Sequence, residues 1–180
     1  MFIKLVLLCL IFSCANNHRS KSILDKVIKT KQLKVGTTFD YAPFSYRDEN
    51  NGPAGLDIER AHKLARSLGA KVIFVETTWK NLIRDLKQHK FDIAMGGISK
   101  NLQRQQTGFF THSYLNNGKM PISLCKNKFK FNKIKKIDSA KTKLIVNSGG
   151  TNYSFVKNNI KNARVIIHPD NNSIFEKIIN

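Results

Sequence analysis

The chain has 180 residues, enough for one ordinary domain or two small lobes with a hydrophobic core. Hydrophobic residues make up 41% of it, which argues against global disorder. The formal net charge of +19 at pH 7 favours anionic small molecules as ligands, but the lysines are scattered and no nucleic-acid-binding signature is present, so we expect no nucleic-acid partner.

The first residues have the pattern of an export signal. The basic start MFIK precedes the apolar run LVLLCLIF, which is too short to span a bilayer as a mature helix. We therefore predict a signal peptide over residues 1–14 and a periplasmic location. The stretch Ile11 to Cys14 also resembles a loose lipobox, so Cys14 is a lipidation candidate and a membrane-anchored lipoprotein stays open beside a soluble exported protein.

Hydrophobic periodicity predicts alternating helices and strands in the first half of the chain. In chain order we expect a helix, a strand, a helix, a strand, a helix and a strand, over residues 22–31, 33–37, 55–68, 71–75, 79–89 and 91–95. Strands separated by helices at these spacings form parallel βαβ units.

A second series of elements follows. We expect an extended stretch, a strand, a helix, a strand and a helix over residues 119–124, 143–146, 151–160, 164–167 and 171–179. The predicted fold class is therefore α/β, with two halves and a ligand cleft between them. The expected organisation is a tether and first helix at 15–32, lobe 1 at 33–115, and a hinge crossing with a partial lobe 2 at 116–180. Cys125 is expected to be a buried small hydrophobe.

The stretch VNSGGTN lies at a predicted strand-to-helix junction. A helix N-terminus exposes unpaired N–H groups and a partial positive charge, and glycines allow a close approach to an anion. Gly150 and Thr151 therefore suit a carboxylate, with the Thr151 hydroxyl as a donor and a helix cap. An ordinary turn that needs glycine for its backbone angles explains the same residues.

Metal and cofactor motifs are not found. The histidines at 62, 89, 112 and 168 have no ligand spacing with cysteine or acidic residues, so we expect no zinc site. The sequence contains no Gly-x-Ser-x-Gly, Walker or dinucleotide-binding motif, and we expect no cofactor.

This chain resembles the family-3 periplasmic solute-binding proteins in the stretches LKVGTTFDYAPFSY, AGLDIERAHKLARSLGA and FDIAMGGISKNLQR. Those proteins bind polar amino acids between two α/β lobes, so the resemblance implies a two-lobed, type II periplasmic binding protein-like fold. Within that superfamily it is similar to the cyclohexadienyl dehydratases in TTWKNLIRDL, YLNNGKMPISLC, IVNSGGTNYSF and HPDNNSIFEKI. Those enzymes convert prephenate to phenylpyruvate, or arogenate to phenylalanine.

The resemblance implies roles for individual residues. Arg104 matches the carboxylate-binding arginine of the family, although an arginine among polar residues is usually solvated. Ser99 matches a neighbouring donor, and the loop with Gly150, Thr151 and Asn152 matches one that holds a substrate carboxylate. The resemblance also implies that Tyr41 and Trp79 form walls of the pocket. It implies that Lys119 and Asn147 supply groups for catalysis.

The resemblance also implies what lies outside this sequence. Relatives continue past the position of Asn180, and the dehydratases place their expected general acid there. We therefore expect a C-terminally truncated protein with an incomplete second lobe, and an inactive product stays open beside an active one. The alternative function is a substrate-binding protein for a polar amino acid, with an ABC permease as its partner. A third alternative is that the chain is a fragment that binds no ligand.

Overall fold

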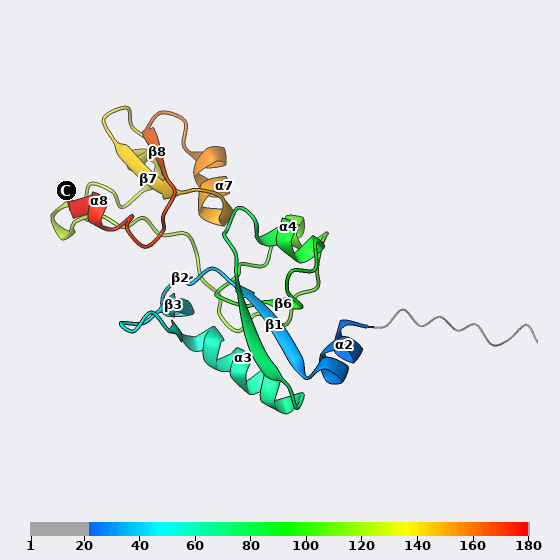
Figure 1. Cartoon of the computed structure of the whole chain (residues 1–180). Coiled ribbons are helices and arrows are strands. Elements are labelled where there is room, and N and C mark those ends of the chain that lie inside the picture. Colours follow the sequence, from blue (N-terminus) through cyan, green and yellow to red (C-terminus); the bar gives the residue numbers. More distant parts are fainter. Residues whose placement is uncertain (1–21, 180) are drawn as a thin grey trace, which may run out of the picture.

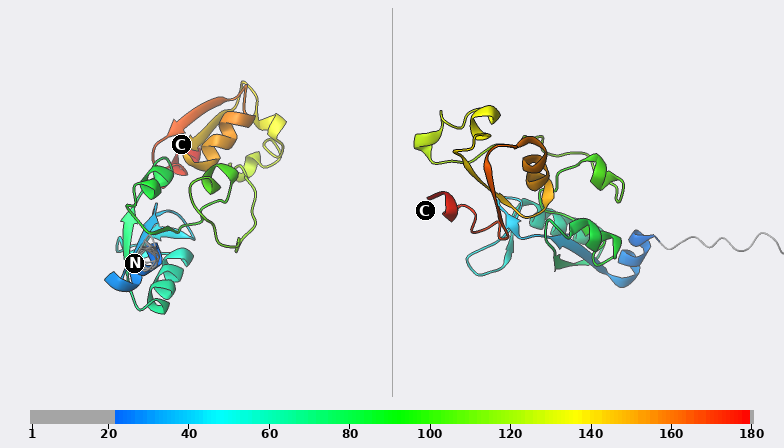
Figure 2. Two further views of the ribbon diagram at one scale, coloured as in Figure 1. Left: turned by 90° about the vertical axis from the view of Figure 1, so that its right-hand side faces the viewer. Right: turned by 90° about the horizontal axis from the view of Figure 1, so that it is seen from above.

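The computed structural model describes residues 22–179 (Figure 1). The predicted signal peptide at 1–14 and the lipidation candidate Cys14 lie outside the described residues. Figures 1 and 2 show two groups of elements, one around strand β1 and one around strands β7 and β8, joined by loops. No helix within residues 22–179 has the length and apolar character needed to cross a membrane.

The first group is built on a parallel three-stranded sheet. Its central strand β1 (Gln32–Thr37) lies between β5 (Lys71–Glu76) and β6 (Ile93–Ala94). β1 and β5 run in register from the Gln32–Lys71 pair to the Thr37–Glu76 pair. All three predicted strands are present, although β6 is shorter than residues 91–95.

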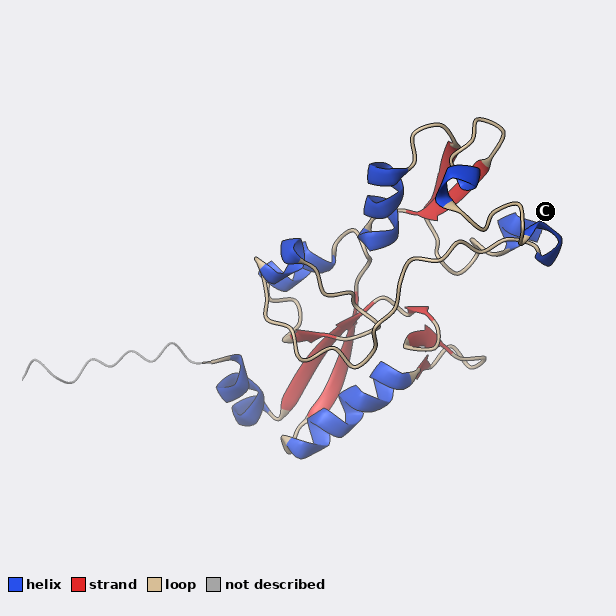
Figure 3. Cartoon of the chain, turned by 180° about the vertical axis from the view of Figure 1, so that it is seen from behind, coloured by secondary structure: helices blue, strands red, loops and turns tan. Residues whose placement is uncertain are grey.

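Helices α2 (Ile23–Thr30) and α3 (Leu56–Ser67) bury apolar residues against this sheet. Figure 3 shows from behind that α3 runs alongside the strands. α2 begins with a capping box between Ser22 and Asp25, which satisfies two backbone N–H groups at its start. The core cluster consists of Val27, Leu33, Val35, Ala61 and Ala65. α4 (Leu82–Lys87) is shorter than the helix predicted at 79–89.

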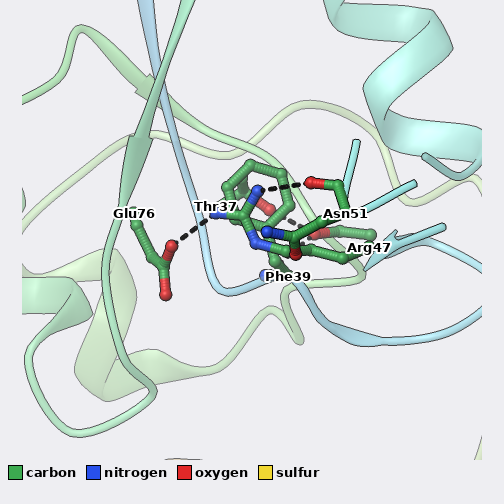
Figure 4. Close-up of polar contacts among 6 residues, drawn as sticks. Thr37, Phe39, Arg47, Asn51 and Glu76 are labelled. Carbon is green, nitrogen blue, oxygen red and sulfur yellow. Dashed lines mark hydrogen bonds and ion pairs between the residues drawn. The ribbon is translucent and has the colours of Figure 1, made fainter. Parts of the chain in front are cut away.

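Three short strands that the periodicity did not predict follow β1. They are β2 (Asp40–Tyr41), β3 (Ser45–Arg47) and β4 (Pro53–Ala54), in one antiparallel sheet. Arg47 joins this sheet to β5 (Figure 4): it donates to Glu76 at 2.6 Å and to the Asn51 carbonyl at 3.2 Å, and its guanidinium lies 4.3 Å from the centre of the Phe39 ring. The Thr37 hydroxyl also hydrogen-bonds to Ser45, so the turn after β1 is held on both sides.

The second group contains the parallel pair β7 (Lys143–Asn147) and β8 (Arg164–His168), with α7 (Gly150–Asn159) between them in sequence. The shorter elements are α5 (Leu102–Gln105), the 3-10 helix η2 (Cys125–Asn127), α6 (Ile134–Ile137) and α8 (Glu176–Ile179). Residues 119–124 belong to no sheet of the described chain, and the helix predicted over 171–179 is reduced to α8. Cys125 is exposed, so its prediction as a buried residue is wrong.

A buried carboxylate connects α3 to two loops. Asp57, in the first turn of α3, accepts hydrogen bonds from the Gly97 amide at 2.7 Å and the Tyr114 hydroxyl at 2.6 Å. Arg60 stacks over the Tyr114 ring at 4.0 Å. Tyr114 lies on the long loop that leads to the second group of elements, so Asp57 fixes the start of that crossing.

Burial of Tyr114 beside Asp57 makes its phenol harder to ionise as the pH rises. Burial, helped by the hydrogen bond to Asp57, raises the pKa of Tyr114 to about 12. Because the fold favours the neutral phenol, the resulting stability is complete below the unfolded pKa of about 10 and is lost as the pH rises through 12. In a tyrosinate absorbance titration of the four tyrosines, we expect Tyr114→Phe to remove the last transition. An unchanged last transition in that variant would assign it to another tyrosine.

Candidate functional site

A pocket lies where the two groups of elements face each other. Its lining includes Gly97 and Asn171 together with all but one of the site residues predicted from the sequence, namely Tyr41, Trp79, Ser99, Lys119, Asn147, Gly150, Thr151 and Asn152. The exception, Arg104, is adjacent: its guanidinium carbon lies 6.0 Å from the centre of the Trp79 ring. The structure therefore brings the predicted residues together in space.

The chain topology explains this convergence. Within the first sheet the chain moves from β1 to β5 on one side and then to β6 on the other, so the loops after these strands meet at one edge. Trp79 follows β5, Ser99 follows β6, and Tyr41 comes after β1. From the opposite side, Asn147 ends β7 and Asn171 follows β8.

Arg104 is a buried cation without an acidic partner among residues 22–179. Its residue is 6% exposed, and its one side-chain hydrogen bond in the described structure goes to the Ser99 carbonyl at 2.9 Å. Asn101 caps α5 by accepting the Arg104 amide at 2.8 Å, which fixes the backbone. Burial lowers the pKa of Arg104, a sign that its charge is poorly solvated. Most of its five N–H donors remain for an anion.

Lys119 is a second cation facing the pocket. Its ammonium donates to the Thr151 hydroxyl at 2.7 Å and to the Asn152 side-chain oxygen at 2.6 Å, both of which are neutral. Burial, followed by the positive charge of Arg104, lowers the pKa of Lys119. One cation, Lys119, therefore lines a pocket whose lining contains no Asp or Glu, and a second, Arg104, lies beside it next to Trp79.

Aromatic side chains form one wall of the pocket. Tyr41 and Trp79 meet edge to face, with ring centres 5.8 Å apart, and Phe44 packs behind Tyr41 at 5.2 Å. The Trp79 indole donates to both Asp40 carboxylate oxygens, at 2.9 and 3.0 Å. Burial raises the pKa of Asp40. Apolar flanks of this kind suit a ring-shaped ligand.

Two residues of this region were not predicted as site residues. Asp40 anchors Trp79, and the Asn171 amide donates to the Asp40 carbonyl at 2.8 Å across 131 positions of sequence. Asp40 lies in a loop after a predicted strand, and Asn171 begins the predicted helix that follows another, so the place after a strand is the only sequence signal for either. Polar residues are common in such loops, so that signal selects neither residue.

The glycines of VNSGGTN have a second structural purpose. Gly149 and Gly150 both have positive φ, 74° and 70°. A Cβ on Gly149 would lie 2.8 Å from backbone atoms of Lys80, and one on Gly150 would lie 3.2 Å from the Cβ of Trp79. The pair therefore allows α7 to approach the turn after β5 from across the pocket.

Thr151 does not cap α7, contrary to the sequence-based expectation. The helix begins at Gly150 with Gly149 as its N-cap, and no side chain caps it. Thr151 lies inside the first turn, and its hydroxyl accepts from Lys119. The first amides of this ten-residue helix have no acceptor within the helix, so they are oriented to bind an anion.

Other parts of the described chain give no competing site of this composition. A wider groove lies between the β3–β4 hairpin and α3, and none of the predicted site residues line it. Within residues 22–179, no three His, Cys, Asp or Glu side chains are grouped so as to hold a metal ion.

Comparison with known proteins identifies the family. Residues 33–178 match the model of the bacterial extracellular solute-binding proteins, family 3. The chain belongs to this family. It is 47% identical over 174 residues to the cyclohexadienyl dehydratase of Pseudomonas aeruginosa, covering 96% of this chain and 65% of that enzyme. The chain thus spans just under two thirds of the length of this relative.

Solved structures of the same family have the same fold. An ancestral amino acid-binding protein, a precursor of cyclohexadienyl dehydratase, has a TM-score of 0.83 at 33% identity, covering 88% of this chain and 70% of that one. An ancestral cyclohexadienyl dehydratase has a TM-score of 0.54 at 41% identity, covering 89% and 67%. The fold is thus the α/β type II periplasmic binding protein fold, of which this chain covers part, as predicted.

Replacing Gly149 tests the approach of the two sides of the pocket. In Gly149→Ala, the positive φ and the contact with the Lys80 backbone should destabilise the protein by about 1–3 kcal/mol. Urea unfolding measures this loss. Gly118→Ala is the matched control, because a Cβ there meets nothing within 4 Å. Equal stability of the two variants would mean that the close approach is absent in solution.

Proposed function

We propose that the protein is an exported cyclohexadienyl dehydratase that takes prephenate as its substrate. The observation that carries this proposal is a pair of cations, Lys119 in the lining and Arg104 beside it, at a pocket without a lining carboxylate. A buried positive charge at Arg104 and a second, exposed one at Lys119 favour a ligand with two negative charges, and prephenate is a dicarboxylate.

The same charge balance ranks the other ligands. A free amino acid or arogenate carries an ammonium group, which needs an acidic or carbonyl partner when it is buried. The acid next to this wall, Asp40, already accepts the Trp79 indole and does not line the pocket. Prephenate therefore fits the described residues better than either alternative.

A binding arrangement follows from the positions of the donors. The side-chain carboxylate of prephenate would meet Arg104 and the first amides of α7, beginning at Gly150. The ring would lie against Trp79 and Tyr41. Lys119 would neutralise the ring carboxylate, and Asn147, which is 6% exposed at the end of β7, would hydrogen-bond to the ring hydroxyl.

The reaction itself requires one proton and no electron transfer. Prephenate dianion and a proton yield the phenylpyruvate anion, carbon dioxide and water, as the ring becomes aromatic. The proton must reach the departing hydroxyl, which is general acid catalysis. The asparagine at 147 has no acidic proton to give, so our proposal keeps the expectation that the general acid lies beyond Asn180.

A binding protein for an ABC transporter is the second candidate. It is favoured by the TM-score of 0.83 with the ancestral amino acid-binding protein, which exceeds the 0.54 with the ancestral dehydratase. Its partner would be an ABC permease. We also propose export to the periplasm for both candidates, from the signal-like segment at 1–14 and the extracellular description of the family.

Ligand-induced stabilisation and product formation test the proposed function together. A ligand at about 100 times its Kd stabilises its protein by about 2.7 kcal/mol, and at equal concentration a tighter ligand stabilises it more. Prephenate should therefore raise the Tm more than L-arginine or arogenate does at equal concentration. Phenylpyruvate is followed by its absorbance. Stabilisation by an amino acid alone, without product, would favour the transporter candidate.

Arg104 variants identify the site within that experiment. Arg104→Ala should abolish the Tm shift with prephenate, while Arg104→Lys should keep part of it because the charge remains without the two-pronged geometry. Arg66→Ala, at the exposed end of α3, removes the same charge elsewhere and should keep the full shift. A full shift in Arg104→Ala would exclude this arginine from the site.

Lys119 predicts how affinity changes with pH. An anion binds the protonated amine, so binding raises the lowered pKa of Lys119 and takes up a proton at alkaline pH. Affinity for prephenate should be highest below that lowered pKa and fall as the pH rises through it. Calorimetry in buffers of different ionisation enthalpy measures the uptake. Lys119→Met should lose both effects, and Lys126→Met should lose neither.

A further inference from the structure

We infer that Asp40 is a positioning residue of this pocket, which sets the orientation of the Trp79 ring and couples it to the loop that follows β8. Its importance for a ligand rests on the proposed function, because that proposal gives Trp79 the ring of the substrate. Its effect on Trp79 itself does not, since every contact in question is present without a ligand.

The carboxylate of Asp40 fixes the indole. An indole N–H can only donate, and a partly buried one needs an acceptor. Both oxygens of Asp40 lie within hydrogen-bonding distance of Nε1, at 2.9 and 3.0 Å. Asp40 belongs to β2 and Trp79 to the turn after β5, so this bond joins two elements that are 39 residues apart.

The backbone of Asp40 receives a contact from the opposite side of the pocket. Its carbonyl accepts the Asn171 amide at 2.8 Å, and Asn171 itself lines the pocket. Asn171 is held by a compact turn after β8, in which Asp170 accepts the amides of Asn172 and Ser173. One residue thus contacts the aromatic wall through its side chain and the second group of elements through its main chain.

The orientation of Trp79 matters because three groups depend on it. The ring meets Tyr41 at 83° and lies 6.0 Å from the Arg104 guanidinium, and a Cβ on Gly150 would meet the Cβ, Cγ and Cδ2 of Trp79. A rotation of the indole would therefore change the aromatic wall, the space beside the arginine and the approach of α7 together. Asp40 holds the hydrogen-bonding end of that ring.

Trp79 is the only tryptophan in the chain, so its fluorescence reports on this contact alone. In the ligand-free protein, Asp40→Ala should shift the emission maximum to the red and make acrylamide quenching stronger, because the indole loses its acceptor and turns toward water. Asn171→Ala should change the spectrum in the same direction by less. Asp40→Asn keeps one acceptor oxygen and should lie between wild type and Asp40→Ala. Glu49→Gln, in the exposed turn before β4, removes the same charge and should leave the spectrum unchanged.

The outcomes separate this inference from the proposed function. Unchanged emission and quenching in Asp40→Ala, with a native circular dichroism spectrum, would overturn the positioning role of Asp40. If Asp40→Ala does not fold, Asp40→Asn and Asn171→Ala provide the test instead. Emission and quenching like those of the wild type in both variants would overturn the positioning role of Asp40. Affinity for prephenate should fall about tenfold in Asp40→Ala, because binding must then order an indole that Asp40 no longer holds. If the wild type binds no prephenate but these spectra shift, only the proposed function fails.

Discussion

The charge of Arg104, buried without an acid beside it in residues 22–179, is the constraint from which the rest of the pocket follows. Moving an ion out of water costs several kcal/mol even after the protein relaxes. Here the Ser99 carbonyl offsets a part of that cost, and Lys119 adds a like charge nearby. A site of this kind is least stable when empty and gains most from an anion. Recognition of acids is therefore a property of how the charges are buried, more than of the net charge of +19.

The glycine pair and the cations serve the same end. The positive φ angles of Gly149 and Gly150 let the start of α7 come within contact distance of Trp79 and Lys80. That approach brings the unpaired amides of the helix to the pocket that Gly150 and Lys119 both line. Making room for a Cβ on either glycine would move the helix amides away from Trp79 and Lys80. Backbone geometry and electrostatics therefore cannot be varied independently here.

Sequence periodicity predicted the elements whose burial is periodic. Helix α3 and strands β1 and β5 were located within one or two residues. Ala61 and Ala65 recur with helical spacing, Leu33 and Val35 with strand spacing, and burial alternates along the first residues of β5. The β2–β4 sheet was missed because strands of two or three residues have no period to read. The helix predicted at 171–179 was mostly wrong: Asp170 binds the amides of Asn172 and Ser173 in a local turn that competes with helix.

The site was predicted less from its residues than from the family resemblance. The burial of Arg104 on a four-residue helix, α5, leaves no mark in a polar stretch, and only the resemblance selected it. The contact between Asp40 and Asn171 joins positions 131 residues apart, so no local pattern encodes it. What local chemistry did predict was the place of the pocket, since loops after parallel strands converge wherever the strand order reverses.

The charge arrangement also bears on how a binding site of this kind turns into a catalytic one. In the proposed reaction the ring carboxylate leaves as neutral carbon dioxide, while the side-chain carboxylate is kept in the product. A strong, two-pronged grip on the ring carboxylate would stabilise the substrate more than the transition state and slow the reaction. Arg104 is therefore better used on the carboxylate that persists, and the single, shared ammonium of Lys119, already bonded to Thr151 and Asn152, is the weaker partner that the departing group requires. Under this assignment the same pair of cations serves a binding protein and a dehydratase, and the step between them is the delivery of one proton to the ring hydroxyl.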